Sequence, residues 1–201
     1  MKKLTILVLI TILFVTILQA NDKLLNDLRA KYDGIKTFEA DITQSAFIVA
    51  WDMTTEAKGV FLIDNDIIVI EFTEPMRQYL KIEKNVMTLY MAEENTAYVD
   101  NNFDEKFGIF NLSEFLTTHN RFELLRRENG LVVYNVINLK EPELKITMYL
   151  NPNTILISKV IMEQRTGDIT TIELKNQKFN QRLSKRISDF VIPQGTEIIR
   201  N

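Results

Sequence analysis

From residue 37 onward, the chain alternates apolar and polar side chains in one short segment after another. Phe38, Ala40 and Ile42 show the period of two that is typical of a half-buried antiparallel strand. The same pattern predicts further strands at residues 53–63, 67–72, 78–83, 87–91, 96–99, 122–127, 131–138, 144–150, 156–164 and 168–179. The pattern therefore indicates a mainly β protein with one large, highly curved antiparallel sheet. Two packed sheets are the alternative.

Two helical patterns accompany these strands and make the predicted class α+β. In residues 22–33, the apolar residues form one stripe, made up of Leu24, Leu25, Leu28 and Tyr32. Gly34 follows, as expected after the end of a helix. A second, short helix is predicted near residues 111–119, where Asn111 is a suitable N-terminal cap and Phe115 and Leu116 are apolar.

The strand at residues 67–70 is apolar on both faces, because it reads Ile-Ile-Val-Ile. The preceding segment, residues 60–63, is equally apolar across a tight turn. Burial of the strand on both sides would explain this, but the predicted helices are too few to cover such a sheet. The other interpretation is a sheet whose concave side encloses an apolar cavity.

The first twenty residues have the pattern of a signal peptide. Lys2 and Lys3 precede an apolar stretch at residues 4–18, and Ala20 offers a small residue for cleavage before Asn21. A transmembrane anchor is the alternative, although the stretch is shorter than the roughly 20 residues that a helical span needs. We expect a mature single domain at residues 21–201. Because the sequence contains no Cys, it predicts neither a lipid anchor nor a disulfide.

The residues needed for common chemistry are scarce. His119 is the only histidine and cysteine is absent, which excludes thiol nucleophiles and His-rich metal sites. Residues 64–66 (Asp-Asn-Asp) fit a hairpin turn better than a calcium loop. The 27 acidic side chains outnumber the 24 basic ones, which argues against nucleic acid as a partner. We therefore expect no catalytic residues, no metal, no cofactor and no enzymatic activity.

Four segments resemble the LolA family of periplasmic lipoprotein carriers. Residues 28–44 resemble the family's helix, turn and F-x-A-x-F-x-Q strand, and Gly59 matches its G-x-L. Glu74-Pro75 and residues 190–197 resemble its Y-x-x-P and F-x-x-P-x-G-x-x motifs. The resemblance implies an incomplete, strongly curved antiparallel β-barrel with a helical lid over an apolar cavity.

The resemblance also implies a function. Family members bind the acyl chains of lipoproteins released by an inner-membrane ABC transporter and carry them to the outer membrane, where a LolB-like acceptor receives them if one is present. The implied protein is a monomer in the periplasm of a Gram-negative-type bacterium. The alternatives are a carrier of free phospholipid or glycolipid and an envelope sensor similar to RseB.

Carried over by position, the resemblance implies a lipid-binding cavity formed by eight residues: Leu28, Tyr32, Ile35, Ile68, Ile70, Phe72, Phe115 and Leu116. The sequence departs from the family at the hairpin. There the family has an arginine that controls lid closure, followed by proline, and this chain has Asp64, Asn65 and Asp66. Arg77 is the candidate for a substitute.

Overall fold

The computed structural model describes residues 23–103, 112–116, 120–139, 142–185 and 190–200. A helix at residues 23–33 opens this part of the chain. The other elements are, in chain order, β1 (Thr37–Ile48), η1 (Val49–Trp51), β2 (Met53–Asp64), β3 (Ile67–Glu74), β4 (Gln78–Glu83), β5 (Val86–Met91), β6 (Thr96–Asp100), α2 (Leu112–Phe115), β7 (Asn120–Glu128), β8 (Leu131–Asn138), β9 (Lys145–Asn151), β10 (Leu156–Glu163), β11 (Ile169–Phe179) and β12 (Glu197–Arg200).

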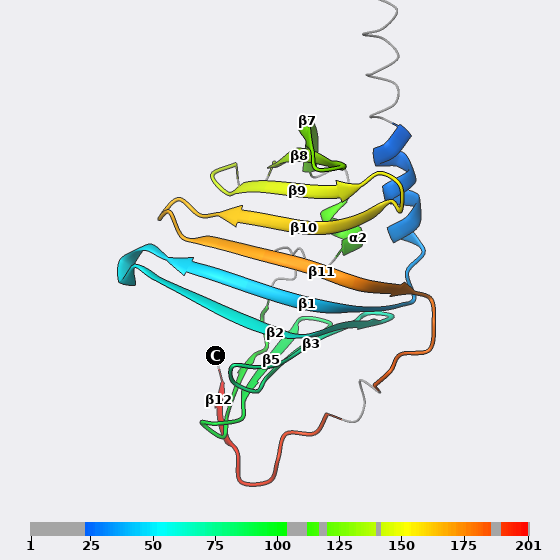
Figure 1. Cartoon of the computed structure of the whole chain (residues 1–201). Coiled ribbons are helices and arrows are strands. Elements are labelled where there is room, and N and C mark those ends of the chain that lie inside the picture. Colours follow the sequence, from blue (N-terminus) through cyan, green and yellow to red (C-terminus); the bar gives the residue numbers. More distant parts are fainter. Residues whose placement is uncertain (1–22, 104–111, 117–119, 140–141, 186–189, 201) are drawn as a thin grey trace, which may run out of the picture.

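All twelve strands belong to one sheet, in the order β12-β6-β5-β4-β3-β2-β1-β11-β10-β9-β8-β7. The sheet does not close on itself, because β12 and β7 are its two edges. Figure 1 shows how strongly it curves, because β5 and β12 lie at a steep angle to the direction of β1. The N-terminal helix and α2 lie against the sheet near β9 to β11. The predicted fold, a mainly β protein with an incomplete, strongly curved barrel-like sheet and helices, is confirmed.

Two clusters of apolar side chains lie on opposite faces of the sheet. The larger cluster joins the inward residues of the strands to the N-terminal helix and to α2, and it is the core of the molecule. The smaller one consists of Leu62, Val69 and Tyr79, with Leu183 and Phe190 packed against it. Both faces of β3 are therefore buried, one in the larger cluster to which the helices also belong and the other under the C-terminal segment.

The predicted strands are present, with shifts of a few residues at their ends and one longer strand, β1. Strand β12 was not predicted, and it pairs with β6 in parallel, which makes it an exception to the antiparallel expectation. All four of its residues are exposed, so no burial pattern marks it in the sequence. Its position depends instead on Asn95, whose carbonyl accepts a hydrogen bond from the Glu197 amide at 3.0 Å.

Gly59 explains a bulge between β2 and β3. A Cβ atom at this position would lie 1.9 Å from the carbonyl oxygen of Glu71 and 2.7 Å from the Cα of Phe72. The register of the two strands shifts between Lys58 and Gly59. Because those neighbours are backbone atoms, which cannot rotate away, only glycine fits the bulge in this form.

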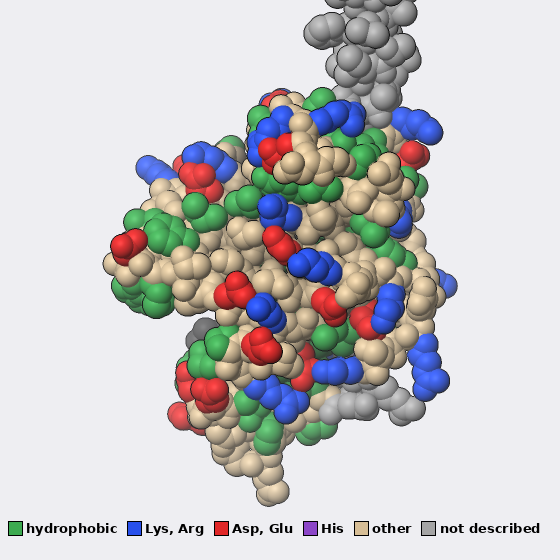
Figure 2. Space-filling view, in the orientation of Figure 1, with side chains coloured by type: hydrophobic (Ala, Val, Ile, Leu, Met, Phe, Trp, Pro, Cys, Tyr) green, Lys and Arg blue, Asp and Glu red, His purple; other side chains and the backbone are tan. Residues whose placement is uncertain are grey.

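The surface in Figure 2 carries interspersed acidic and basic side chains, and hydrophobic side chains gather at the end where the β1–β2 hairpin turns. Trp51 is 70% exposed there, next to the exposed Val49 and Met53. Among the described residues, no helix is both long and apolar enough to cross a bilayer. The predicted signal peptide lies outside the described residues, and so do Asn111 and His119.

Candidate lipid-binding interior

Three separate segments bring the eight predicted cavity residues together. The N-terminal helix and the turn after it provide Leu28, Tyr32 and Ile35. Strand β3 provides Ile68, Ile70 and Phe72, all from one face as the period of two requires. Helix α2 and the residue after it provide Phe115 and Leu116. All eight belong to the core cluster, Ile35 as a partly buried member, and their role in binding lipid stays a prediction.

The interior is filled by side chains in this structure. Leu28, Tyr32 and Ile70 have 0% exposure, so no water-sized space adjoins them. Tyr32, Phe38, Phe61 and the partly buried Phe179 form an aromatic group in it, with ring centroids 5.1 to 5.4 Å apart along three edge-on contacts. An acyl chain could therefore enter only if the helices moved and their apolar side chains gave up these contacts.

Tyr32 attaches the N-terminal helix to the sheet by polar contacts as well as by burial. Its hydroxyl donates to Gln177 Oε1 at 2.9 Å and accepts from the Ile157 amide at 3.2 Å. Gln177 in turn donates to the Ile157 carbonyl at 2.7 Å. Burial raises the pKa of the Tyr32 hydroxyl, so the group stays neutral. Sequence reasoning treated Tyr32 as apolar lining and did not identify this network.

Arg29 connects the N-terminal helix to the end of α2. Its Nε donates to the Leu116 carbonyl oxygen at 2.9 Å, and its guanidinium lies 5.6 Å from the centroid of the Phe122 ring. Lys31 forms a second tie from the same helix, to the Thr154 carbonyl at 2.7 Å. Sequence reasoning missed both residues. Nothing in the sequence shows that the carbonyl of Leu116 lies within reach of Arg29.

Of the hairpin residue Asn65 and the candidate substitute Arg77, only Asn65 lies near the N-terminal helix: its backbone amide donates to the carbonyl oxygen of Lys36, just after the helix, at 2.6 Å. Asn65 is exposed in the β2–β3 turn with φ 52°, and its side chain donates to Asp64 at 2.9 Å. Arg77 Nη2 lies 3.0 Å from Glu71 Oε1, on the outer side of the sheet. The expectation that Arg77 substitutes for the family's arginine is therefore not met by its position. Residues 64–66 do form the predicted hairpin turn.

No group of three or more His, Cys, Asp or Glu side chains in the described part of the chain is arranged to hold a metal ion. The described part of the interior contains apolar groups, the hydroxyls of Tyr32 and Tyr134, the side-chain amide of Gln177 and backbone amides. This arrangement can bury hydrocarbon, and it offers no nucleophile next to a base among the residues described here.

No family model matches the chain. An uncharacterized protein from Methanocaldococcus jannaschii is 25% identical over 187 residues, which make up 89% of this chain. The match spans only about half, 53%, of the length of that relative.

An uncharacterized conserved protein from Thermus thermophilus has a similar solved structure, with a TM-score of 0.57 and 9% identity over 90% of this chain and 99% of its own. A LolA superfamily protein from Nitrosomonas europaea aligns with a TM-score of 0.44 and 11% identity, covering 81% of this chain and 94% of its own. The complex of MucA and MucB from Pseudomonas aeruginosa aligns with a TM-score of 0.47 and 12% identity, covering 83% of this chain and 59% of the other. The solved structures similar to this chain thus include LolA superfamily proteins, and what the likeness shows is the fold.

Proposed function

We propose that this protein is an exported, non-enzymatic carrier that shields the acyl chains of lipoproteins in the space between its helices and the concave face of its sheet. The observation that carries the proposal is the closure of a predominantly apolar concave face by two short helices. A helix can swing away from such a face, whereas a second sheet would be fixed by its own hydrogen bonds.

The energetics of acyl burial support this arrangement. Burial of hydrocarbon contributes about 0.8 kcal/mol per methylene, so one long acyl chain is worth roughly 10 kcal/mol. An acyl chain that takes the place of the Leu25, Leu28 and Tyr32 side chains would offset much of the apolar burial that is lost when the helix moves. The filled interior described above then corresponds to the empty, closed carrier.

The polar ties of the N-terminal helix define a latch in this proposal. A hydrogen bond to a charged group contributes about 1.5–3 kcal/mol, which suits a contact that must hold the closed state and still release. Arg29 is the best-placed group, because it connects the N-terminal helix directly to the end of α2. In this proposal, Arg29 has the role in lid closure that the LolA resemblance assigns to an arginine in the hairpin.

The implied partners follow from this proposal. An inner-membrane ABC transporter would load the carrier in the periplasm, and a LolB-like acceptor would unload it. Mass spectrometry of material that copurifies with the protein separates the cargo classes: acylated peptides support a lipoprotein carrier, phospholipid or glycolipid supports a lipid carrier, and a non-acylated peptide of a membrane protein supports an envelope sensor.

The latch provides the direct test. Arg29→Met keeps an unbranched apolar side chain and removes both the hydrogen bond to Leu116 and the cation over the Phe122 ring, so exchange of a fluorescent triacylated lipopeptide should become at least about tenfold faster. Lys23→Met is the matched control, since Lys23 lies on the same helix and, among the residues that the structure describes, its ion pair is with Asp27 at 3.9 Å. Equal exchange rates in the two variants would contradict the role of Arg29.

A photoreactive group on the acyl chain tests the location. Crosslinks should map by mass spectrometry to Leu28, Ile70 or Phe115. A protein that does not bind the lipopeptide, or that is labelled only outside the interior, would contradict the carrier function itself.

A further inference from the structure

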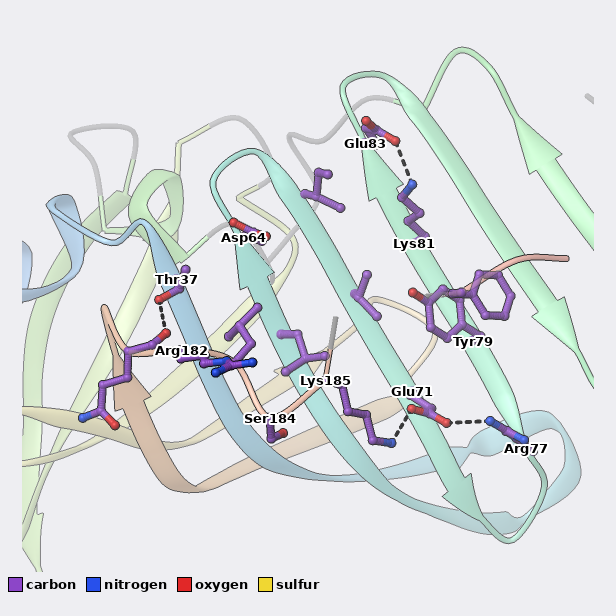
Figure 3. Close-up of a pocket in the computed structure, with 16 residues that line it drawn as sticks. Thr37, Asp64, Glu71, Arg77, Tyr79, Lys81, Glu83, Arg182, Ser184 and Lys185 are labelled. Carbon is purple, nitrogen blue, oxygen red and sulfur yellow. Dashed lines mark hydrogen bonds and ion pairs between the residues drawn. The ribbon is translucent and has the colours of Figure 1, made fainter. Parts of the chain in front are cut away.

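A second candidate site lies on the outer face of the sheet. A cavity of about 1140 Å³ runs between strands β2 to β4 and the C-terminal segment, residues 181–185 and Phe190. We call it the outer groove; Figure 3 shows its lining. Typical small-molecule pockets measure roughly 300–1,000 Å³, so the outer groove is large enough for a ligand of that class.

The floor of the outer groove is apolar. Leu62, Ile67 and Val69 point outward from β2 and β3, and Leu183 packs against this group from the C-terminal segment. Leu62 and Val69 are only 2% and 1% exposed, so the partly buried Ile67 and Leu183 form the surface that a ligand can touch. At one end, the Phe190 ring stacks on Tyr79 with centroids 3.3 Å apart and an interplanar angle of 12°. A hydrocarbon chain in the groove would therefore contact aliphatic side chains along its length and an aromatic pair at its end.

The wall of the outer groove carries one positive charge in excess, because Arg77, Lys81, Arg182 and Lys185 line it together with Asp64, Glu71 and Glu83. Glu71 has a side chain that is only 9% exposed, and it binds two cations, Arg77 at 3.0 Å and Lys185 at 2.6 Å. Lys81 and Glu83 balance each other at 2.8 Å. Burial raises the pKa of the Glu71 carboxyl, but the hydrogen bonds and charges of Lys185 and Arg77 lower it by more, so the pKa lies below its ordinary value and the carboxylate is ionised. Its single negative charge balances only one of these two cations.

Arg182 adds an unused cation to this wall. In Figure 3, its side chain lies over β1 and β2 on the side of the groove. Within the part of the chain that the structure describes, Arg182 makes neither an ion pair nor a hydrogen bond. A guanidinium has five donors and binds carboxylate and phosphate oxygens in pairs, so Arg182 has its full capacity free for an anion.

We infer that the outer groove binds a single-chain amphiphile with an anionic headgroup, either a carboxylate or a phosphate. Arg182 binds the headgroup, and the chain lies against Ile67 and Leu183. This inference does not depend on the proposed carrier function, because Ile67 and the interior residue Ile70 lie on opposite faces of β3.

The test compares three ligands with the same chain on the full-length exported protein: dodecanoate, dodecyl phosphate and dodecanol, by isothermal titration calorimetry. Arg182→Glu should weaken binding of the two anions at least about tenfold and leave dodecanol unchanged. Arg165→Glu makes the same charge change at a turn outside the groove, where the side chain is 82% exposed, and should leave all three affinities unchanged. The tighter of the two anions then identifies the headgroup class.

Location is tested with a dodecanoate that carries a diazirine at the chain end. Labelling of Ile67 or Leu183 supports the outer groove, and it should be lost in Arg182→Glu. Equal anion binding by Arg182→Glu and the unchanged protein would overturn the inference, as would labelling confined to interior residues such as Leu28. Failure here leaves the lipopeptide result intact, and failure of lipopeptide binding leaves this one intact.

Discussion

Strand β3 has two apolar faces that the rest of the chain covers in different ways. On the inner face, Ile68, Ile70 and Phe72 pack into a core that is closed by helices. On the outer face, Ile67 and Val69 are accompanied by the buried Glu71, and an irregular C-terminal segment covers them. A helix satisfies its own backbone groups, whereas an irregular segment needs partners for them. The outer face therefore contains charges, and the inner face excludes them.

Glu39 shows the same requirement further along the outer cover. Its carboxylate accepts hydrogen bonds from the Ser184 amide at 2.6 Å and from Lys178 at 2.8 Å. Burial raises the pKa of Glu39, but these hydrogen bonds and the Lys178 charge lower it below its ordinary value. Two largely buried acids, Glu39 and Glu71, thus hold the C-terminal segment on the sheet.

The strongest test of the comparison places the same charge on each face of β3. Ile70→Lys puts an unpaired ammonium among Phe61 and Leu80, where exposure is 0% at Ile70, and we expect a loss of at least about 4 kcal/mol of unfolding free energy. Ile67→Lys puts it between Asp64 and Glu83 at the groove, where the long side chain reaches water, and should cost about 1 kcal/mol or less. Urea unfolding of both variants measures the difference; equal costs would show that the two faces are not distinct.

A smaller effect should come from Glu71 and should depend on pH. Glu71→Gln removes the charge that Arg77 and Lys185 bind, and we expect a loss of about 1.5–3 kcal/mol at pH 7. The folded-state pKa of Glu71 is lowered, so the unfolded state binds more protons, and the contribution is present above the ordinary glutamate pKa. It should disappear as the pH falls through the folded-state pKa.

Unfolding free energies of the unchanged protein and of Glu71→Gln, measured between neutral and acidic pH, should therefore converge at the acid end. A difference that stays constant with pH would show that shape, and not charge, gives Glu71 its role.

The smallest difference is predicted for two tyrosines, one on each face. Tyr32→Phe removes two hydrogen bonds from the interior and should cost about 1–2 kcal/mol, because Gln177 and the Ile157 amide lose a partner. Burial and the neighbouring Glu71 charge raise the pKa of Tyr79 to about 12, and its hydroxyl makes no hydrogen bond among the residues described. Tyr79→Phe should stay within about 0.5 kcal/mol. Thermal unfolding of the two variants measures the difference in stability. A larger loss of stability for Tyr79→Phe than for Tyr32→Phe would contradict the greater importance of the Tyr32 hydroxyl.

Much of the fold could be predicted from the sequence, because a half-buried strand repeats its burial every second residue. The alternation in Phe38, Ala40 and Ile42 locates β1, and the stripe formed by Leu25, Leu28 and Tyr32 locates the N-terminal helix. The same periodicity placed Ile68, Ile70 and Phe72 on one face, where the structure has them. Patterns of this kind depend on neighbours a few residues away, and the sequence contains those directly.

Tertiary structure alone decided what covers the other face. Lys185 binds Glu71 from 114 residues away, and Arg29 reaches the Leu116 carbonyl across 87 residues. Neither contact corresponds to a repeat in the sequence. Each depends on how strongly the sheet curves, because the curvature decides which distant segments come within reach of each other. The sequence determined that β3 is apolar on both sides. Which side faces helices, and which faces a segment held by buried charges, was decided by the curvature of the complete sheet.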